Sequence, residues 1–150
     1  MVKRFGASQE VPLTDVEFGV SQVLPVLVLC YTVPPGSTVI LEQPEIHLHP
    51  SAQSALADVF IDAIENRGIQ LVLESHSEHL LRRLQRRIAE KALSPDKTRL
   101  FFCDIDGDVS RIDRPDIDMF GNIRNWPQNF FGDMVGDMLH MLDATALPEG

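Results

Sequence analysis

The stretch VILEQPEIHLHP, residues 39–50, decides the fold. It overlaps a β-branched apolar run, residues 37–41, which follows the turn sequence VPPG and predicts a short parallel strand buried on both faces. This strand runs directly into Glu42, with Gln43 and Glu45 close behind. Because open parallel sheets place their ligands at the carboxyl ends of the strands, we expect these three side chains to line a crevice there.

The residues that follow predict a helix, a second strand and a second helix. Pro50 and Ser51 open a segment whose apolar positions repeat every 3.6 residues, and Gly68 follows it as a C-terminal cap. Residues 70–73 form another short apolar run, and residues 78–91 are amphipathic. The order strand, helix, strand, helix predicts a right-handed βαβ unit on a parallel sheet.

The flanks of this unit are less regular. Upstream, Ser21 is expected to cap a helix that ends near Tyr31. Downstream, residues 99–103 predict a third strand, and a DIDGD turn leads into residues 109–112, which indicates a hairpin at the edge of the sheet. Beyond Pro115 we expect irregular chain that ends in a short helix from about residue 131. The resulting division is a lead-in (1–18), a lobe (19–114) and a C-terminal extension (115–150).

Composition narrows the class of protein. At 150 residues and 44% hydrophobic content, one globular domain is expected. A net charge of −9 argues against a surface that binds nucleic acid throughout, so any such contact needs a local basic patch. Cys30 and Cys103 lie in apolar runs, as free thiols do in a reducing compartment. The longest apolar run, residues 23–33, is too short to span a bilayer, so a cytoplasmic protein without a membrane segment is expected.

Residues 39–50 resemble the Walker B strand of ABC-type ATPases, especially the branch related to recombination and overcoming-lysogenization-defect proteins. The resemblance implies that Glu42 holds Mg²⁺ and that Gln43 occupies the position of the hydrolytic glutamate. An amide orients water but accepts no proton, so general-base assistance of roughly 10²–10⁴-fold would be missing unless Glu45 stands in. The segment IHLHP matches the D-loop, which makes His47 and His49 candidates for a dimer interface.

Two further segments carry the same resemblance. In LVLESHSEHLL, residues 71–81, His76 matches the switch histidine that contacts the γ-phosphate of ATP, while the flanking serines are suited to cap a helix. EFGVSQVLPVL, residues 17–27, resembles a degenerate signature motif. There Gly19, Ser21 and Gln22 would cover the γ-phosphate bound by the opposite subunit of a head-to-head dimer, since helix N-termini favour phosphate.

The resemblance covers most of residues 15–90 and implies an α/β fold. It predicts a partial P-loop NTPase lobe of the ABC type, a mainly parallel sheet flanked by helices with an edge hairpin. No GxxxxGK followed by Ser or Thr occurs in the sequence, so the phosphate-binding loop is expected from a missing N-terminal half or a partner chain. A split subunit, a truncation and a decayed gene all stay open. GNIRNWPQNFFGDMVGDM, residues 121–138, resembles a short C-terminal domain of uncharacterised function in bacterial ATPases of this branch.

Three other functions are open at this stage. Histidines and carboxylates at the strand ends suggest a metal-dependent hydrolase: His47, His49, His76 and His79 with Glu42, Glu45 and Glu74. A Toprim-like nuclease would use Asp104, Asp106 and Asp108 with Glu74, although DIDGD is also ordinary turn chemistry. A non-catalytic interaction module would use an arginine face for an acidic partner or nucleic acid, although a solvated helix face is the simpler interpretation. That face comprises Arg82, Arg83, Arg86 and Arg87.

Overall fold

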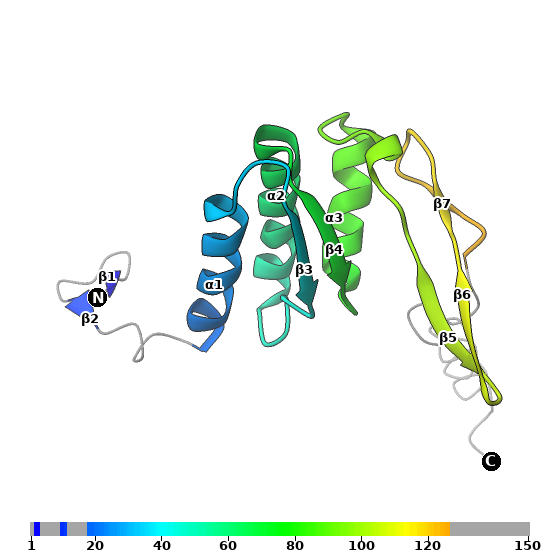
Figure 1. Ribbon diagram of the computed structural model, residues 1–150, viewed down its shortest axis with the longest axis horizontal. Coiled ribbons are helices and arrows are strands. Elements are labelled where there is room, and N and C mark those ends of the chain that lie inside the picture. The colour runs from blue at the N-terminus through cyan, green and yellow to red at the C-terminus, as the bar shows by residue number, and fades with distance from the viewer. Residues whose placement is uncertain (1, 4–9, 12–17, 127–150) are drawn as a thin grey trace, which may run out of the picture. The chain divides into compact units, whose positions relative to one another are not determined.

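The structure, a computed structural model, describes residues 2–3, 10–11 and 18–126 (Figure 1). It divides into two units, residues 1–93 and 94–150. The elements of the first unit, in chain order, are β1 (Val2–Lys3), β2 (Glu10–Val11), α1 (Phe18–Thr32), β3 (Thr38–Glu42), α2 (Pro50–Arg67), β4 (Gln70–Glu74) and α3 (Glu78–Ala89). The short strands β1 and β2 form an antiparallel pair inside the segment that the sequence left as a lead-in.

The predicted βαβ unit is confirmed as β3, α2 and β4. The two strands are parallel and in register, with Val39 beside Leu71 and Leu41 beside Leu73. Among the described residues this parallel sheet has only these two strands, so it is smaller than the mainly parallel sheet expected from the sequence. The side chains of Val39 and Leu41 on β3 and of Leu71 and Leu73 on β4 lie on one face of the sheet and pack toward the helices. Helix α2 connects the two strands.

The ends of α2 have clear chemical causes. The Nδ1 atom of His49 accepts a hydrogen bond from the backbone N–H of Ser51, and Pro50 occupies the first helical position, where no N–H partner is needed. At the other end Gly68 has φ +64° and its N–H donates to the Ile64 carbonyl, as a left-handed C-terminal cap requires. The predicted glycine cap is therefore confirmed.

The core of the first unit lies between the helices and one face of the sheet. Its buried members come from all three helices and both strands or their ends: Cys30, Val39, Leu41, Leu56, Ala57, Phe60, Ala63, Ile69 and Leu80. Burial raises the pKa of the Cys30 thiol, which behaves here as a small hydrophobic side chain. The apolar periodicity of α2 and α3 predicted four of these positions, Leu56, Phe60, Ala63 and Leu80.

The expectation that β3 is buried on both faces is wrong. Burial alternates along the strand, and Ile40 on its open face is 68% exposed. Val72, its neighbour on β4, is 50% exposed. The reason is that the described helices supply their core side chains to the opposite face, where Val39 and Leu41 lie. A continuous apolar run cannot distinguish a strand covered on two faces from one covered on a single face.

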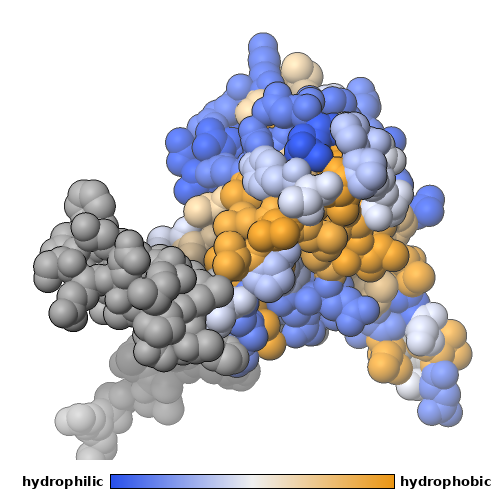
Figure 2. All heavy atoms as spheres, turned by 60° about the vertical axis from the view of Figure 1, so that its left-hand side comes forward, coloured by the Kyte–Doolittle hydropathy of each residue, from blue (hydrophilic) through white to orange (hydrophobic). Residues whose placement is uncertain are grey.

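The first helix also differs from its prediction. It begins at Phe18, so Ser21 lies inside it and is not its N-cap, and Pro25 is well within the helix. Proline has no N–H to donate to the Ser21 carbonyl, which sits one turn earlier. The outer side chains Leu24, Val28 and Leu29 are exposed. Figure 2, turned to bring this side forward, shows a broad band of hydrophobic side chains.

The second unit consists of short elements: η2 (Pro95–Lys97), β5 (Phe102–Asp106), β6 (Val109–Asp113), β7 (Asp116–Ile117) and β8 (Ile123–Arg124). The predicted hairpin is confirmed as β5 and β6, joined by a two-residue turn in which Gly107 has φ +62°. Its place at the edge of the parallel sheet is not: among the described residues β5 and β6 form a sheet of their own, and β5 includes Asp104 and Asp106, which were expected in the turn. The pair β7 and β8 lies where irregular chain was expected. The short helix expected from about residue 131 lies outside the described residues.

Candidate functional site

Two neighbouring strands end together at one edge of the first unit. Glu42 closes β3 and Glu74 closes β4, and the two residues are partners in the parallel register. Gln43 follows the first strand, and Ser75 and His76 follow the second. Figure 1 shows that α1 begins at this same end of the unit. The sequence-predicted residues Glu42, Gln43, Glu45 and His76 therefore gather at one edge, while Gly19, Ser21 and Gln22 lie in the first turns of α1.

Gln43 faces β4 through both its backbone and its side chain. Its N–H donates to the Glu74 carbonyl at 2.9 Å, and its Nε2 donates to Glu74 Oε1 at 3.4 Å. Its φ of +44° is a left-handed value that residues other than glycine adopt at a cost of about 1–3 kcal/mol. Such conformations concentrate at functional sites, where the surrounding structure holds them.

Glu45 is buried, with only 5% of its surface exposed. Its Oε1 accepts hydrogen bonds from Ser75 Oγ at 2.7 Å and from the backbone N–H of His76 at 3.0 Å. Its Oε2 is buried and has no hydrogen-bond partner among the residues that the structure describes. This carboxylate thus joins the segment after β3 to the turn after β4.

The imidazole of His76 extends toward solvent. Its side chain is 79% exposed, and Nε2 lies 4.0 Å from Glu74 Oε1. Its backbone N–H is held by Glu45, so the loop is anchored while the ring remains exposed to solvent. Glu42, at the end of β3, is also exposed.

Glu74 is a site residue whose position sequence reasoning did not single out. It appeared there only as a ligand in the two metal-dependent alternatives, yet the structure places it between the Gln43 amide and the His76 ring. The signal that could have found it is the register: a polar residue ending the strand beside Glu42 must share its edge.

A second polar link joins the same two segments. Ser77 accepts a hydrogen bond from the Leu80 N–H at 3.0 Å and thereby caps α3, which confirms the predicted capping role. Its hydroxyl donates to Gln53 Oε1 at 2.6 Å, and Gln53 Nε2 donates to the Leu48 carbonyl at 2.9 Å. Ser75 does not cap α3; its Oγ accepts from the Ser77 N–H and donates to Glu45. Sequence reasoning missed Gln53.

Comparison with known families gives two matches. Residues 5–82 match a family described as "AAA domain, putative AbiEii toxin, Type IV TA system". This chain belongs to that AAA-domain family. Residues 93–141 match a second family, "Protein of unknown function (DUF3696)", in agreement with the expected C-terminal domain of uncharacterised function. Neither the curated proteins nor the solved structures contain a significant match.

Two exposed carboxylates, Glu42 and Glu74, end the parallel strands of this AAA domain. Magnesium is usually held by one or two carboxylates together with waters and substrate phosphates, and the exposed Glu42 beside Glu74 suits that arrangement. Within residues 18–126 no three histidine, cysteine or acidic side chains come together in a way that could hold a metal ion. The histidine-rich segments therefore do not assemble the ligand set that a zinc hydrolase needs, and His49 instead caps α2.

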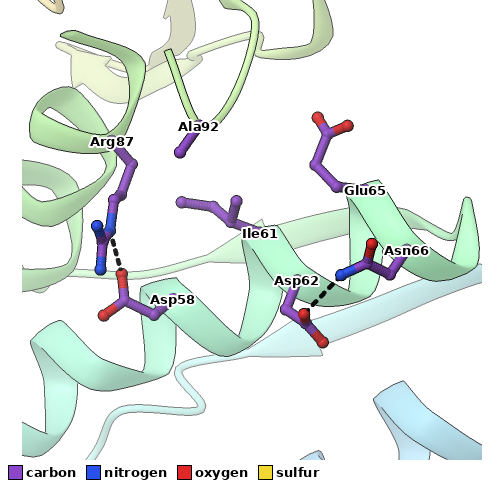
Figure 3. A pocket seen from close by; sticks show the side chains of 7 residues that line it. All are labelled: Asp58, Ile61, Asp62, Glu65, Asn66, Arg87 and Ala92. Carbon is purple, nitrogen blue, oxygen red and sulfur yellow. Dashed lines mark hydrogen bonds and ion pairs between the residues drawn. The ribbon is translucent and has the colours of Figure 1, made fainter. Parts of the chain in front are cut away.

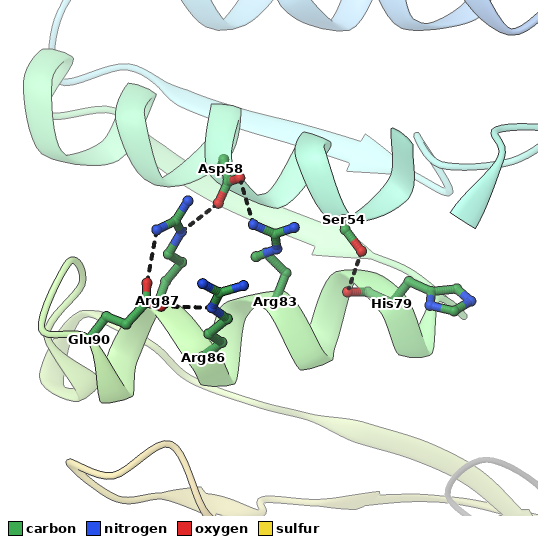
Figure 4. Close-up of polar contacts among 7 residues, drawn as sticks. All are labelled: Ser54, Asp58, His79, Arg83, Arg86, Arg87 and Glu90. Carbon is green, nitrogen blue, oxygen red and sulfur yellow. Dashed lines mark hydrogen bonds and ion pairs between the residues drawn. The ribbon is translucent and has the colours of Figure 1, made fainter. Parts of the chain in front are cut away.

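The arginine face of α3 in the first unit is occupied by carboxylates. Figure 4 shows Asp58 of α2 against Arg83 and Arg87, at 3.2 and 2.7 Å, and Glu90 against Arg86 at 2.7 Å. Arg82 pairs with Glu78. The hydrogen bond from Arg87, with the charges of the arginines, holds the pKa of Asp58 below its ordinary value. This face is the paired, solvated helix surface, which weakens the alternative of a basic docking patch.

A shallow hollow of about 240 Å³ lies in the first unit, between α2 and the end of α3 (Figure 3). Its walls include Asp58, Asp62 and Arg87, whose polar atoms already bind neighbouring side chains. No residue proposed from the sequence for nucleotide binding lines it. Across the described residues, no helix is long and apolar enough to cross a membrane.

Proposed function

We propose that this chain supplies part of the ATP site of an ABC-type ATPase: the signature, Walker B and switch-histidine elements. The observation that carries the proposal is the meeting of Glu42, Gln43 and His76 at the carboxyl edge of a parallel strand pair, in a chain of the AAA-domain family. Ligands of open α/β sheets bind at this edge.

Each residue at the edge has a distinct role in the proposal. Magnesium neutralises charge on the β- and γ-phosphates, and Glu42 holds it, usually through water. The exposed ring of His76 contacts the γ-phosphate and so distinguishes ATP from ADP. Gln43 orients the attacking water through its amide but accepts no proton, so hydrolysis is slow.

Gly19, Ser21 and Gln22 serve a different site in the proposal. They lie in the first turns of α1, where the helix dipole favours a phosphate. In a head-to-head dimer they cover the γ-phosphate bound by the opposite subunit. His47, exposed and with φ +64°, and His49 lie in the segment assigned to that dimer interface.

The site needs a phosphate-binding loop from elsewhere, either a further N-terminal segment or a partner chain. The 150 residues contain no GxxxxGK followed by Ser or Thr. The exposure of Ile40 and Val72 agrees with this, because parallel sheets are normally covered on both faces. The free thiols of Cys30 and Cys103 suit the reducing cytoplasm.

A second candidate is a non-catalytic interaction module that retains the ATPase fold. Gln43, in place of a general base, is the observation that favours it. The two candidates differ in whether a completed assembly turns over ATP.

Phosphate release by the chain combined with a P-loop-bearing partner tests the proposal. We expect slow hydrolysis. We also expect His76→Ala to lower the preference for ATP over ADP by about tenfold or more, because the variant loses one hydrogen bond to a charged group. His79→Ala, on the adjoining helix, is the matched control. Nucleotide binding without any turnover would select the interaction module. No effect of His76→Ala on the preference would contradict the assigned site.

A further inference from the structure

Glu45 connects two loops that the sequence separates by thirty residues. It follows β3, yet its carboxylate reaches the turn after β4, where Oε1 accepts from Ser75 Oγ at 2.7 Å and from the His76 N–H at 3.0 Å. One oxygen thus fixes both a side chain and the backbone of the residue assigned to the γ-phosphate. A side-chain carbonyl or carboxylate oxygen can accept two hydrogen bonds, so this one contact point orders the turn.

The same contact makes Glu45 a poor general base. A base must meet the attacking water, but this side chain is 5% exposed and its Oε1 already accepts two hydrogen bonds. Its Oε2 is buried as well. The carboxylate is therefore engaged in hydrogen bonds within the protein, and the length of the side chain matters more than its basicity.

The backbone around Glu45 supports a positioning role. Gln43, two residues earlier, holds a left-handed φ and donates its N–H to the Glu74 carbonyl. The second link, from Gln53 to Ser77, ties the start of α2 to the cap of α3. The loops after β3 and β4 are thus joined by Glu45 at the carboxyl ends of the strands, and the helices that follow them are joined by Gln53 and Ser77. Of these two links, the one that Glu45 makes includes the His76 amide itself.

We propose that Glu45 is a positioning residue that fixes the place of His76, and that it is not a substitute for the missing catalytic glutamate. Of this role, only the assignment of the γ-phosphate as the target of His76 rests on the proposed function. The geometry itself, in which a carboxylate holds the His76 amide, is independent of that target.

Two variants distinguish the effect of side-chain length from the effect of charge at Glu45. Glu45→Asp keeps the charge but shortens the side chain by one methylene, so it loses contact with the turn. Glu45→Gln keeps the length and an amide oxygen that can accept both hydrogen bonds, but it has no charge. Glu65→Asp and Glu65→Gln, at an exposed position of α2, are the matched controls.

Hydrogen exchange of the His76 amide in the nucleotide-free chain, measured by NMR, tests the proposal. We expect exchange about tenfold faster in Glu45→Asp and within about twofold of the wild type in Glu45→Gln, with the core amides of Leu56 and Phe60 unchanged. Ser75→Ala is a milder variant, and there the His76 amide should stay protected because its own bond to Glu45 remains. Unchanged exchange in Glu45→Asp, or equal acceleration in both Glu45 variants, would overturn the positioning role.

The ATP-over-ADP preference of the assembly completed by a P-loop-bearing chain then separates the two claims. A reduced preference in Glu45→Asp and a retained one in Glu45→Gln support the positioning of His76 for the γ-phosphate. If the amide exchange follows the prediction and neither variant changes the preference, the positioning role stands and the proposed nucleotide contact of His76 fails.

Discussion

At the scale of one residue, Gln43 shows which properties can be predicted from the sequence and which depend on the folded backbone. The sequence predicted its place just after a strand, because an apolar β-branched run stops at Leu41, two residues before it. The left-handed φ and the bond to Glu74 were not predictable, since they depend on a strand that pairs from thirty residues away. The same holds for Glu45, whose hydrogen bonds with Ser75 and His76 join it to a turn thirty residues away.

The strained backbone at Gln43 predicts an unusual order of stability among variants at this position. Glycine accepts positive φ without strain, so Gln43→Gly should change the free energy of unfolding by less than about 0.5 kcal/mol, its lower strain offsetting its greater unfolded-state entropy. A β-branched Gln43→Val should destabilise by about 1–2 kcal/mol. Urea unfolding measures both values. A more stable valine variant than glycine variant would contradict the left-handed conformation.

Ser77 is expected to be the most important of the serines in the turn before α3. Its Ser77→Ala variant loses the cap to Leu80 and the bond to Gln53, and should lower the free energy of unfolding by about 1–2 kcal/mol. Ser54→Ala is a suitable control because its hydroxyl makes only a long 3.5 Å contact with the His79 carbonyl. Equal losses in chemical denaturation of the two variants would count against the capping role.

At the scale of elements, the sequence predicted the helices and strands of the βαβ unit and the glycine cap of α2. It predicted them because apolar periodicity and turn residues are local signals. It misplaced the start of α1, where the structure continues the helix through Ser21 and Pro25, and it could not tell which face of β3 stays open. Those properties depend on packing between elements.

The pairing of α2 with α3 gives a prediction that depends on pH. Asp58→Asn should lower the free energy of unfolding near pH 7 by about 1 kcal/mol, a value limited by the partial exposure of the ion pairs. Because Arg87 and Arg83 lower the pKa of Asp58 in the folded state, the wild-type advantage is complete above the ordinary aspartate pKa of about 3.9 and is lost as pH falls through the folded pKa.

The difference in stability between the wild type and Asp58→Asn should therefore shrink as the pH falls from about 5 to about 3. Thermal unfolding across that range measures it, with Asp108→Asn in the exposed hairpin turn as the control. A difference that grows toward acid would mean that Asp58 has a raised pKa, contrary to its hydrogen bonds with arginine.

At the scale of the whole molecule, the family and the α/β class were predictable because the motifs follow one another along the chain. The size of the parallel sheet was not, since its two described strands leave Ile40 and Val72 exposed. The grouping of Glu42, Gln43 and His76 followed from the parallel order alone, whereas Glu74 and Gln53 became visible only through the register and the contacts between loops.

The central claim is that this chain completes an ATP site only together with a phosphate-binding loop. Calorimetric titration of Mg-ATP into the purified 150-residue chain, repeated after adding a P-loop-bearing polypeptide encoded beside it, tests the claim most directly. We predict no binding to the chain alone and binding to the combined chains. Binding of Mg-ATP by the isolated chain, or no binding under either condition, would contradict it.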